Sequence, residues 1–223
     1  MGGYYEDRLS GAGLQKCYAI APPRIRQYLD AELRFVVDQV QGAELILELG
    51  CGYGRVLKTL SPDATRVVGC DTSRKSLELA RSYVRPRRNI ALVRTDAART
   101  AFPSDTFDAV VCIQNGISAF GIDPRILGEE AVRVTKPGGR ILFSSYSPRI
   151  WDERLDWFRK QARAGLLGQI DESRTGKGTI VCQDGFRATT VDGSEFKRLF
   201  LGLGRTVEVL EIDESSVFCI VLK

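Results

Sequence analysis

The stretch LILELGCGYGRVLKTL, residues 45–60, decides how this chain folds. Its first five residues form a short apolar run typical of a buried strand, and a helical pattern begins at Arg55. Between them Gly50, Gly52 and Gly54 stand at alternate positions. A strand, a glycine-rich turn and a helix in this order let a ligand approach backbone N–H groups at the carboxyl end of the strand.

The spacing of these glycines distinguishes the turn from two common nucleotide-binding motifs. The dinucleotide fingerprint G-x-G-x-x-G, counted from Gly50, needs a glycine where Arg55 stands, and no phosphate loop G-x-x-x-x-G-K-[ST] occurs. The sequence instead has E-x-G-x-G-x-G, which starts at Glu48. We expect Glu48 to order the loop by accepting N–H hydrogen bonds; the alternative is a strand-end charge that reaches solvent.

Short apolar runs alternate with helical patterns as far as residue 145, which indicates βαβ units and a parallel sheet. Right-handed crossovers between such strands predict a doubly wound α/β fold. Strands are expected at 45–49, 66–70, 90–94, 107–113 and 139–145, and helices at 55–60, 73–84 and 124–134.

The last third of the chain predicts antiparallel additions to this sheet. Asp184-Gly185 lies between strand-like runs and indicates a β-hairpin insertion near 179–190. Asp192 then caps a helix, and 205–212 with 216–223 form a second hairpin. The predicted fold is therefore a Rossmann-like mixed sheet of about seven strands, mostly parallel, with an antiparallel C-terminal hairpin.

Residues 1–42 predict a helical cap in front of this domain, which we assign to 43–223. Pro22 and Pro23 suit the first turn of a helix, and apolar residues beyond them recur at spacings of three and four. The cap also contains several tyrosines, which we interpret as packing residues with a polar end; the alternative is that they close over the cofactor and contact the acceptor. They are Tyr4, Tyr5, Tyr18 and Tyr28.

Composition excludes several classes of protein. The 223 residues are 43% apolar and 27% charged, as in a globular chain with one large core. No apolar run approaches the ~20 residues that span a bilayer, and no signal-peptide pattern opens the chain, so we expect a cytoplasmic location. The net charge is only +4, and we interpret the basic run at 81–88 as a solvated helix end, so nucleic-acid binding is not favoured.

The sequence contains no histidine, and its six cysteines form no C-x-x-C pair. We therefore predict no metal site, and we expect the cysteines to be buried as small hydrophobic residues. A catalytic base, if the reaction needs one, must be a carboxylate, tyrosine or lysine, and the sequence assigns none.

Motifs downstream of the glycine turn resemble those of the class I S-adenosylmethionine-dependent methyltransferases of small-molecule type. VVGCDTS places Asp71 after the second strand, and VRTDAA places Asp96 after the third. FPSDTFDAVVCIQ resembles the fourth motif, and EEAVRVTKPGGRILFS the stretch leading into strand five. With the glycine turn, five motifs in order cover residues 45–145.

The resemblance implies S-adenosylmethionine as the cofactor. It implies that Asp71 holds the ribose hydroxyls, Asp96 the adenine amino group, and Gln114 with Asn115 the methionyl part. A carboxylate can accept from both hydroxyls of a diol, and acidic groups suit a ligand with an ammonium and a sulfonium. The expected cofactor-binding residues are Glu48, Gly50, Cys51, Gly52, Gly54, Asp71, Thr72, Asp96, Ala97, Gln114 and Asn115.

The sequence leaves the methyl acceptor unidentified. Displacement at a sulfonium mainly requires alignment and exclusion of water. A small-molecule acceptor is expected, because no RNA-binding domain is present and IQNGIS stands at 113–118, where amino-methylating relatives carry N/D-P-P-Y/F. We expect its pocket to form from 1–42 and about 146–190, although the helical spacing of Trp151, Leu155 and Phe158 is more typical of a core.

Three alternatives stay open at this point. An RNA or protein methyltransferase would keep the same cofactor motifs. A cofactor-binding interaction protein without transferase activity would keep them too. A nucleotide-binding oxidoreductase is weakened by Arg55, which breaks the dinucleotide spacing.

Overall fold

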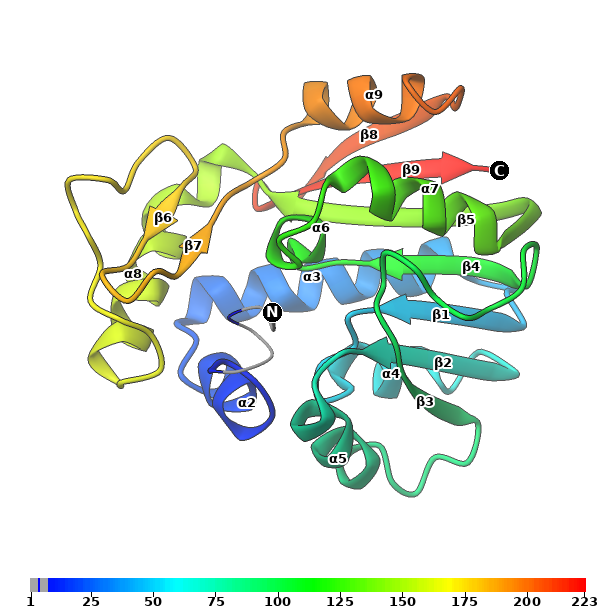
Figure 1. The fold of residues 1–223 in the computed structure, drawn as a ribbon, viewed down its shortest axis with the longest axis horizontal. Helices are drawn as coiled ribbons and strands as arrows, with labels where there is room; N and C mark the ends of the chain where they lie inside the picture. Colours follow the sequence, from blue (N-terminus) through cyan, green and yellow to red (C-terminus); the bar gives the residue numbers. More distant parts are fainter. Residues whose placement is uncertain (1–3, 5–7) are drawn as a thin grey trace.

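The computed structural model describes Tyr4 and residues 8–223, so residues 1–3 and 5–7 of the expected cap lie outside it. Within this part of the chain a seven-stranded sheet has the order β3-β2-β1-β4-β5-β9-β8 (Figure 1). The strands are β1 (Leu45–Leu49), β2 (Arg66–Asp71), β3 (Ile90–Arg94), β4 (Phe107–Cys112), β5 (Thr135–Tyr146), β8 (Val207–Ile212) and β9 (Ser216–Leu222).

The strand directions confirm the predicted mixed sheet. Strands β1 to β5 pair in parallel, whereas β9 pairs antiparallel with both β5 and β8. From β1 the chain adds β2 and then β3 on one side of the sheet, and it then crosses to the other side of β1, where β4 and β5 follow. The strand order therefore reverses between β1 and β4. Ligands of open α/β sheets bind outside the carboxyl ends of the strands at such a reversal, so the topology alone points to this edge.

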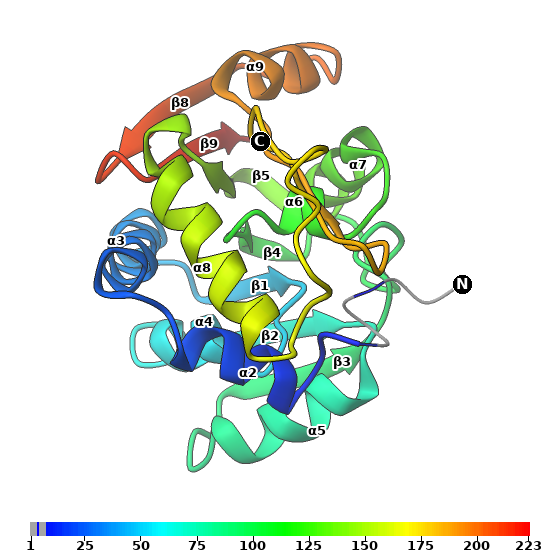
Figure 2. The same ribbon diagram turned by 90° about the vertical axis from the view of Figure 1, so that its left-hand side faces the viewer.

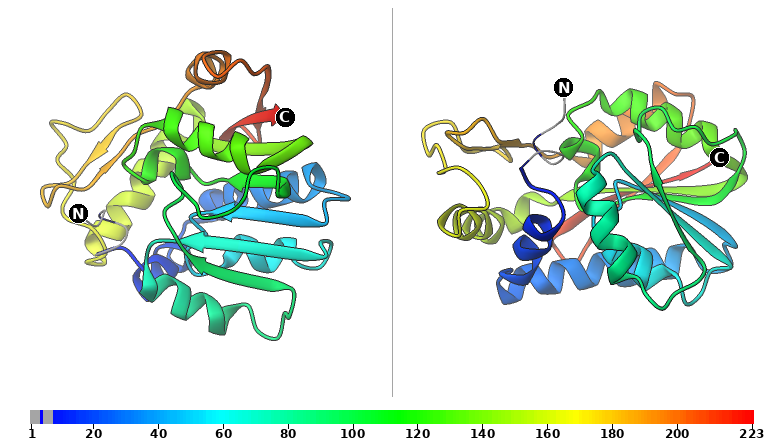
Figure 3. Two further views of the ribbon diagram at one scale, coloured as in Figure 1. Left: turned by 45° about the vertical axis from the view of Figure 1, so that its right-hand side comes forward. Right: turned by 60° about the horizontal axis from the view of Figure 1, so that its bottom comes forward.

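Helices cover both faces of the sheet (Figure 3). Apolar residues of α7 and α9 pack on one face, and those of α3 and α4 pack on the other. The helices are α2 (Ala12–Ala19), α3 (Pro23–Gln39), α4 (Arg55–Leu60), α5 (Arg74–Tyr83), α6 (Gly116–Ala119), α7 (Pro124–Val134), α8 (Trp151–Arg163) and α9 (Gly193–Leu201), with a short 3-10 turn η1 (Pro148–Ile150).

A separate apolar cluster joins the cap to the segment that follows β5. It contains buried residues of α2 and α3 together with α8 and the small hairpin of β6 (Ile180–Val181) and β7 (Arg187–Ala188). Figure 2 shows α8 crossing in front of the carboxyl edge of the sheet, beside α2 and α3. Segments about 140 residues apart in the chain therefore share one core above the edge where a ligand is expected.

One strand begins earlier than the sequence predicted. The sequence predicted a strand at 139–145, but β5 already starts at Thr135, which pairs with Phe107. The register then shifts, and Arg140 pairs with Ala109. Gly138 and Gly139 thus lie within an irregular start of the strand, because strand pairing outweighs the local propensity for a turn.

Two other expectations are confirmed. All six cysteines are free and buried. In the basic run, Arg81, Arg85, Arg87 and Arg88 are exposed at the end of α5, as a solvated helix terminus requires.

The capping box at the N-terminus of α9 is expected to stabilise the fold. Asp192 Oδ1 accepts the N–H groups of Ser194 and Glu195, and Glu195 Oε2 accepts the N–H of Asp192 at 2.7 Å, which completes a capping box. We expect Asp192→Ala to lower the free energy of unfolding by about 1 kcal/mol, measured by urea denaturation. Asp192→Ser keeps an acceptor and should lose less; equal losses for the two variants would contradict a capping role.

Candidate functional site

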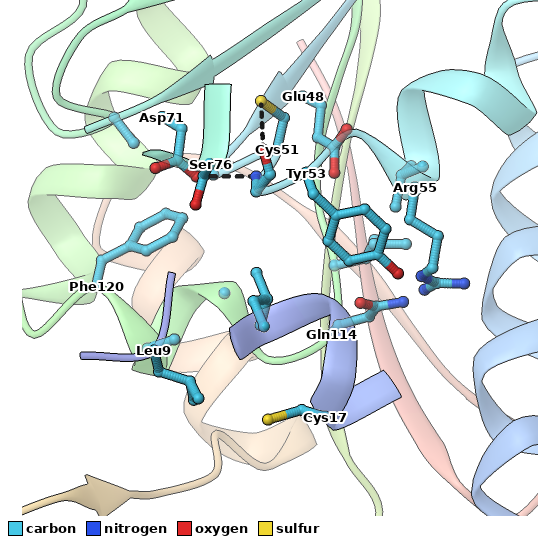
Figure 4. Close-up of a pocket in the computed structure, with 18 of the residues that line it drawn as sticks. Leu9, Cys17, Glu48, Cys51, Tyr53, Arg55, Asp71, Ser76, Gln114 and Phe120 are labelled. Carbon is cyan, nitrogen blue, oxygen red and sulfur yellow. Dashed lines mark hydrogen bonds between the residues drawn. The ribbon is translucent and has the colours of Figure 1, made fainter. Parts of the chain in front are cut away.

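A cavity of ≈ 340 Å³ lies at the carboxyl ends of β1, β2 and β4, beneath α2 (Figure 4). In Figure 4 the glycine loop lies between Asp71 and Phe120 at one end and Glu48, Arg55 and Gln114 at the other. The structure brings all but two of the predicted cofactor-binding residues into this wall: Glu48, Gly50, Cys51, Gly52, Asp71, Thr72, Asp96, Ala97 and Gln114.

Gly54 and Asn115 are the two residues that the structure places elsewhere. A Cβ at Gly54, which has φ +90°, would lie 2.8 Å from Cγ1 of Val84, so this glycine permits close packing against the end of α5. The Asn115 side chain is buried, donates to the carbonyl of Thr189 at 2.8 Å and accepts from Ser145 Oγ at 2.7 Å. Both residues support the wall from behind.

The glycine loop is ordered by Asp71 and not by Glu48. Asp71 Oδ2 accepts the N–H of Gly52 at 2.8 Å, and its Oδ1 accepts the N–H of Ser73 at the same distance. The Cys51 N–H donates to the carbonyl at the end of β2. Among the described residues, no loop N–H donates to Glu48, so the first expectation for that residue is wrong.

Glu48 does not reach solvent either, because its side chain is only 4% exposed. In Figure 4 its carboxyl group points toward Tyr53 and Arg55, away from the loop amides. Burial raises the pKa of Glu48 to about 8, although the charge of Arg55 opposes this shift. Such a carboxyl group is mostly neutral at pH 7, and a cation that binds beside it would favour its ionised form.

Buried polar atoms without hydrogen-bond partners gather at this end of the cavity. Among the described residues they include Glu48 Oε2, Arg55 Nε and Nη2, and Gln114 Nε2. Tyr28 and Glu32 are buried as well, and they interact with each other, because the carboxyl of Glu32 raises the pKa of Tyr28 and the hydroxyl of Tyr28 lowers that of Glu32. Buried polar groups are normally hydrogen-bonded, so this concentration marks the place of a polar ligand or of water.

Glu32 is a buried carboxyl group outside the cavity wall. Its Oε1 accepts from Ser144 Oγ at 2.6 Å and from Ser216 Oγ at 3.1 Å, and burial raises its pKa to about 7. The side chain joins α3 to β5 and β9 and does not line the cavity.

Helix α2, part of the expected cap, covers the cavity. At its start the Gly11 N–H donates to Ser76 Oγ at 3.0 Å, and near its end Tyr18 Oη donates to Gln114 Oε1 at 2.7 Å. The Trp157 indole also donates to the Cys17 carbonyl at 3.0 Å. The helix is therefore tied to the sheet side and to α8.

The cap tyrosines divide into two groups. Tyr18 lines the cavity, where its ring packs against Tyr53 and Trp157 and its hydroxyl donates to Gln114, so it is a packing residue with a polar end. Tyr28 is fully buried. Tyr4 donates to Asp184 Oδ2 at 2.6 Å, which ties the cap to the small hairpin. Tyr5 lies outside the described residues.

The stripe on α8 is buried, as expected for a core, but its neighbours also form part of the cavity. Leu155 and Phe158 are buried among apolar residues. Phe158 nevertheless lines the cavity together with Trp157 and Gln161. The helical periodicity alone could not reveal this, because it places residues on a face without saying what that face covers.

Residues 46–139 match the family model described as a methyltransferase domain. The match spans less than half of the chain. These residues form a methyltransferase domain. Among solved structures, this domain's fold is similar to PH0226 protein from Pyrococcus horikoshii OT3, with a TM-score of 0.70 and 21% identity, covering 98% of this chain and 97% of that one. It is also similar to the DhpI-SAM-HEP complex, with a TM-score of 0.66, 20% identity and coverage of 99% and 94%.

Curated relatives of the methyltransferase domain include quinone methyltransferases. The demethylmenaquinone methyltransferase of Beutenbergia cavernae is 35% identical over 109 residues, which are 48% of this chain and 43% of that protein. The 2-methyl-6-phytyl-1,4-hydroquinone methyltransferase of Synechocystis sp. is 26% identical over 160 residues, which are 66% and 49%. The chain thus spans less than half the length of these two relatives.

No helix in the described part of the structure is both long and apolar enough to cross a membrane. No cluster of three or more cysteine, aspartate or glutamate side chains there could hold a metal ion.

Proposed function

We propose that the chain transfers the methyl group of S-adenosylmethionine to a small-molecule acceptor by direct displacement. One observation carries this proposal. The glycine loop and Asp71 line the same cavity as Glu48, Arg55 and Gln114, whose buried polar atoms lack hydrogen-bond partners. One end offers acceptors for a diol, and the other offers opposite charges for an amino acid.

The adenosine end is assigned to Asp71 and Asp96. The Asp71 carboxylate accepts backbone N–H groups with both oxygens at the cavity wall, and the ribose hydroxyls would donate to the same carboxylate. Asp96 and Ala97 lie in the wall beyond it, beside Thr72, where the adenine ring would lie.

The methionyl end is assigned to the polar group at the other end. Arg55 would bind the α-carboxylate, since a guanidinium matches a carboxylate in charge and geometry. Glu48 would face the α-ammonium, and Gln114 has an unpartnered amide N–H group to offer. This assignment explains why Glu48 keeps an oxygen, and Arg55 and Gln114 keep N–H groups, without hydrogen-bond partners among the described residues.

The chain's own contribution to the reaction would be alignment and exclusion of water. The acceptor's electron pair forms the new bond to the methyl carbon as the sulfur–carbon bond breaks, and any proton displaced from the acceptor leaves to solvent. The cavity in which the methyl group would be transferred has an apolar wall, formed in part by Phe120, Ile113 and Trp157. Helix α2 covers this cavity. A dry, oriented site favours displacement because it fixes the approach and removes competing water.

Glu48 makes the affinity for S-adenosylmethionine depend on pH. Its pKa of about 8 means that the carboxyl is mostly protonated at pH 6 in the free protein, and a bound ammonium favours the ionised form. Binding therefore releases a proton, and we expect the affinity to rise between pH 6 and 7.5, by up to about tenfold per pH unit. Calorimetry in buffers of different ionisation enthalpy measures both quantities.

Glu48→Gln supplies the comparison for that experiment. The variant keeps the shape but has no proton to release, so its affinity should be lower at pH 7.5 and nearly constant over the range. A pH slope that persists unchanged in Glu48→Gln would assign the released proton to another group.

Calorimetry with S-adenosylmethionine, S-adenosylhomocysteine and NAD tests the proposal itself. Binding of the first two and not of NAD is expected; a preference for NAD would favour an oxidoreductase and overturn the proposal. Methyl transfer to a panel of small hydroxylated rings, including the hydroquinones that the relatives' names suggest, then tests turnover. Binding without transfer to small molecules, RNA or protein would favour an interaction protein. A cytoplasmic location stays a prediction from the sequence.

A further inference from the structure

A column of three buried polar side chains, Tyr146, Tyr28 and Glu32, leads from the cavity into the space between β5 and α3. Tyr28 and Glu32 are four residues apart on α3 and share one face of the helix. Ser144 and Tyr146 are two residues apart on β5 and share one face of the strand. Ser144 Oγ donates to Glu32 Oε1 at 2.6 Å, and the ring centres of Tyr28 and Tyr146 are 5.2 Å apart. The two faces therefore oppose each other along the column.

Glu32, at the inner end of the column, can hold a proton near neutral pH. Its side chain is 0% exposed, and burial raises its pKa to about 7. The groups that face it lower this pKa; they are Ser144, Ser216, Arg55 and Tyr28. About half of the Glu32 carboxyl is therefore ionised at pH 7 and available as a base.

Tyr146, at the outer end of β5, is the member of the column that lines the cavity. Burial raises its pKa to about 12; the charge of Arg154 and the hydroxyl of Tyr28 lower it, and Glu32 raises it further. Such a phenol is neutral at pH 7, so it can take a proton from a ligand only if it passes on its own. The Tyr28 hydroxyl acts on both Tyr146 and Glu32 and thus connects them. Catalytic hydrogen bonds that are long in a free enzyme shorten when substrate binds.

Other groups of the cavity wall are already in use. The carboxylates of the wall are assigned to the cofactor. Of the three tyrosines in the described wall, Tyr18 donates to Gln114 Oε1 at 2.7 Å. Tyr53 lies at the end where Glu48 is assigned to the ammonium (Figure 4). Tyr146 remains as the tyrosine that leads to a carboxyl group outside the wall.

We propose that the methyl acceptor is a hydroxylated ring, that Tyr146 is the catalytic residue that takes its hydroxyl proton, and that Tyr28 and Glu32 carry this proton away. The inference rests on the proposed methyl transfer. As the O–H bond of the acceptor breaks, its proton binds Tyr146 Oη, the Tyr146 proton moves to Tyr28, and the Tyr28 proton moves to the Glu32 carboxylate. The electron pair left on the acceptor forms the bond to the methyl carbon, and the sulfur keeps the pair of the broken sulfur–carbon bond. Glu32 returns the proton to solvent by the reverse path after the product leaves.

Acceptors of different acidity test this relay. Methyl transfer is measured at saturating S-adenosylmethionine to 4-methylcatechol and methylhydroquinone, which are neutral at pH 8, and to 4-nitrocatechol, which is largely ionised there. Glu32→Gln, Tyr28→Phe and Tyr146→Phe keep the shapes of the side chains. Since general-base catalysis contributes about 100-fold or more, we expect kcat for the neutral rings to fall by roughly that factor, with little change in KM. The ionised ring needs no base, so its kcat should change little.

The pH profile distinguishes a relay from a structural role. In the wild-type protein kcat for the neutral rings should rise with pH up to about 7, as Glu32 ionises, and then level off. Glu32→Gln should lose this limb of the profile. A carboxyl group that only holds α3 to the sheet would leave the profile of the folded variant unchanged.

Two matched controls remove the same groups elsewhere. Tyr83→Phe removes a tyrosine hydroxyl outside the cavity wall, and Glu208→Gln neutralises an exposed carboxylate on β8. Neither should change kcat or its pH profile.

The outcomes separate this inference from the proposed function. If the wild-type protein binds S-adenosylhomocysteine but methylates none of the three rings, the hydroxylated acceptor is excluded and transfer to other acceptors is untouched. If the rings are methylated and folded Glu32→Gln and Tyr28→Phe proteins keep the wild-type kcat and pH profile, the relay is overturned. If S-adenosylhomocysteine itself does not bind, the proposed function fails, and this inference fails with it.

Discussion

Gly52→Val is expected to abolish binding of S-adenosylmethionine while the sheet stays folded. Gly52 has φ +52°, and a Cβ there would lie 2.9 Å from Cδ2 of Leu14 on α2. A branched side chain would strain the loop and fill the cavity where the cofactor approaches. We expect a loss of at least about 3 kcal/mol, roughly 100-fold or more in Kd, measured by calorimetry.

Gly42→Val controls for the strain of the backbone alone. Gly42 has φ +79°, but nothing lies within 4 Å of the Cβ position, and the residue is remote from the cavity. This variant should be destabilised yet bind the cofactor normally. A folded Gly52→Val protein with normal affinity would contradict the assignment of the glycine loop.

Asp71→Ala is expected to have the second largest effect. The change removes the proposed acceptor for the ribose hydroxyls and also the acceptor for the Gly52 and Ser73 N–H groups. Loss of hydrogen bonds to a charged group costs about 1–3 kcal/mol, so we expect the affinity for S-adenosylmethionine to fall roughly 5- to 150-fold.

Asp63→Ala is a suitable comparison, because that carboxylate is exposed and lies outside the cavity. It should leave affinity unchanged. Thermal unfolding of both variants reports whether the loop anchor also stabilises the fold. Unchanged affinity in a folded Asp71→Ala protein would remove Asp71 from the ribose site.

The cofactor motif could be predicted because its determinants are local. A strand, a turn and a helix follow one another within 45–60, and the spacing of glycines reports directly on the backbone. The acidic residues at the ends of β2 and β3 could be placed for the same reason, since parallel strands end at one edge of the sheet. The edge itself brings Asp71 and Asp96 to one wall.

The errors concern contacts between residues that are distant in sequence. Asn115 turns away from the cavity because its partner is the carbonyl of Thr189, 74 residues later. Glu48 is buried with its Oε2 unpartnered, in a wall that Tyr18 of α2 also lines, which no pattern around residue 48 can show. The bond of Tyr18 to Gln114 could not be predicted for the same reason, since the two residues are 96 positions apart.

The ties between the cap and the segment after β5 bear on how such a protein could change its substrate. Trp157 donates to the carbonyl of Cys17, and Tyr4 and Arg8 both bond to Asp184. If either the cap or the segment after β5 is replaced alone, these hydrogen bonds are lost. The cofactor motif lies between the two segments in the sequence and is contained in one continuous stretch. Substrate range would thus be inherited as a matched pair of segments, and an engineer who grafts one must graft the other.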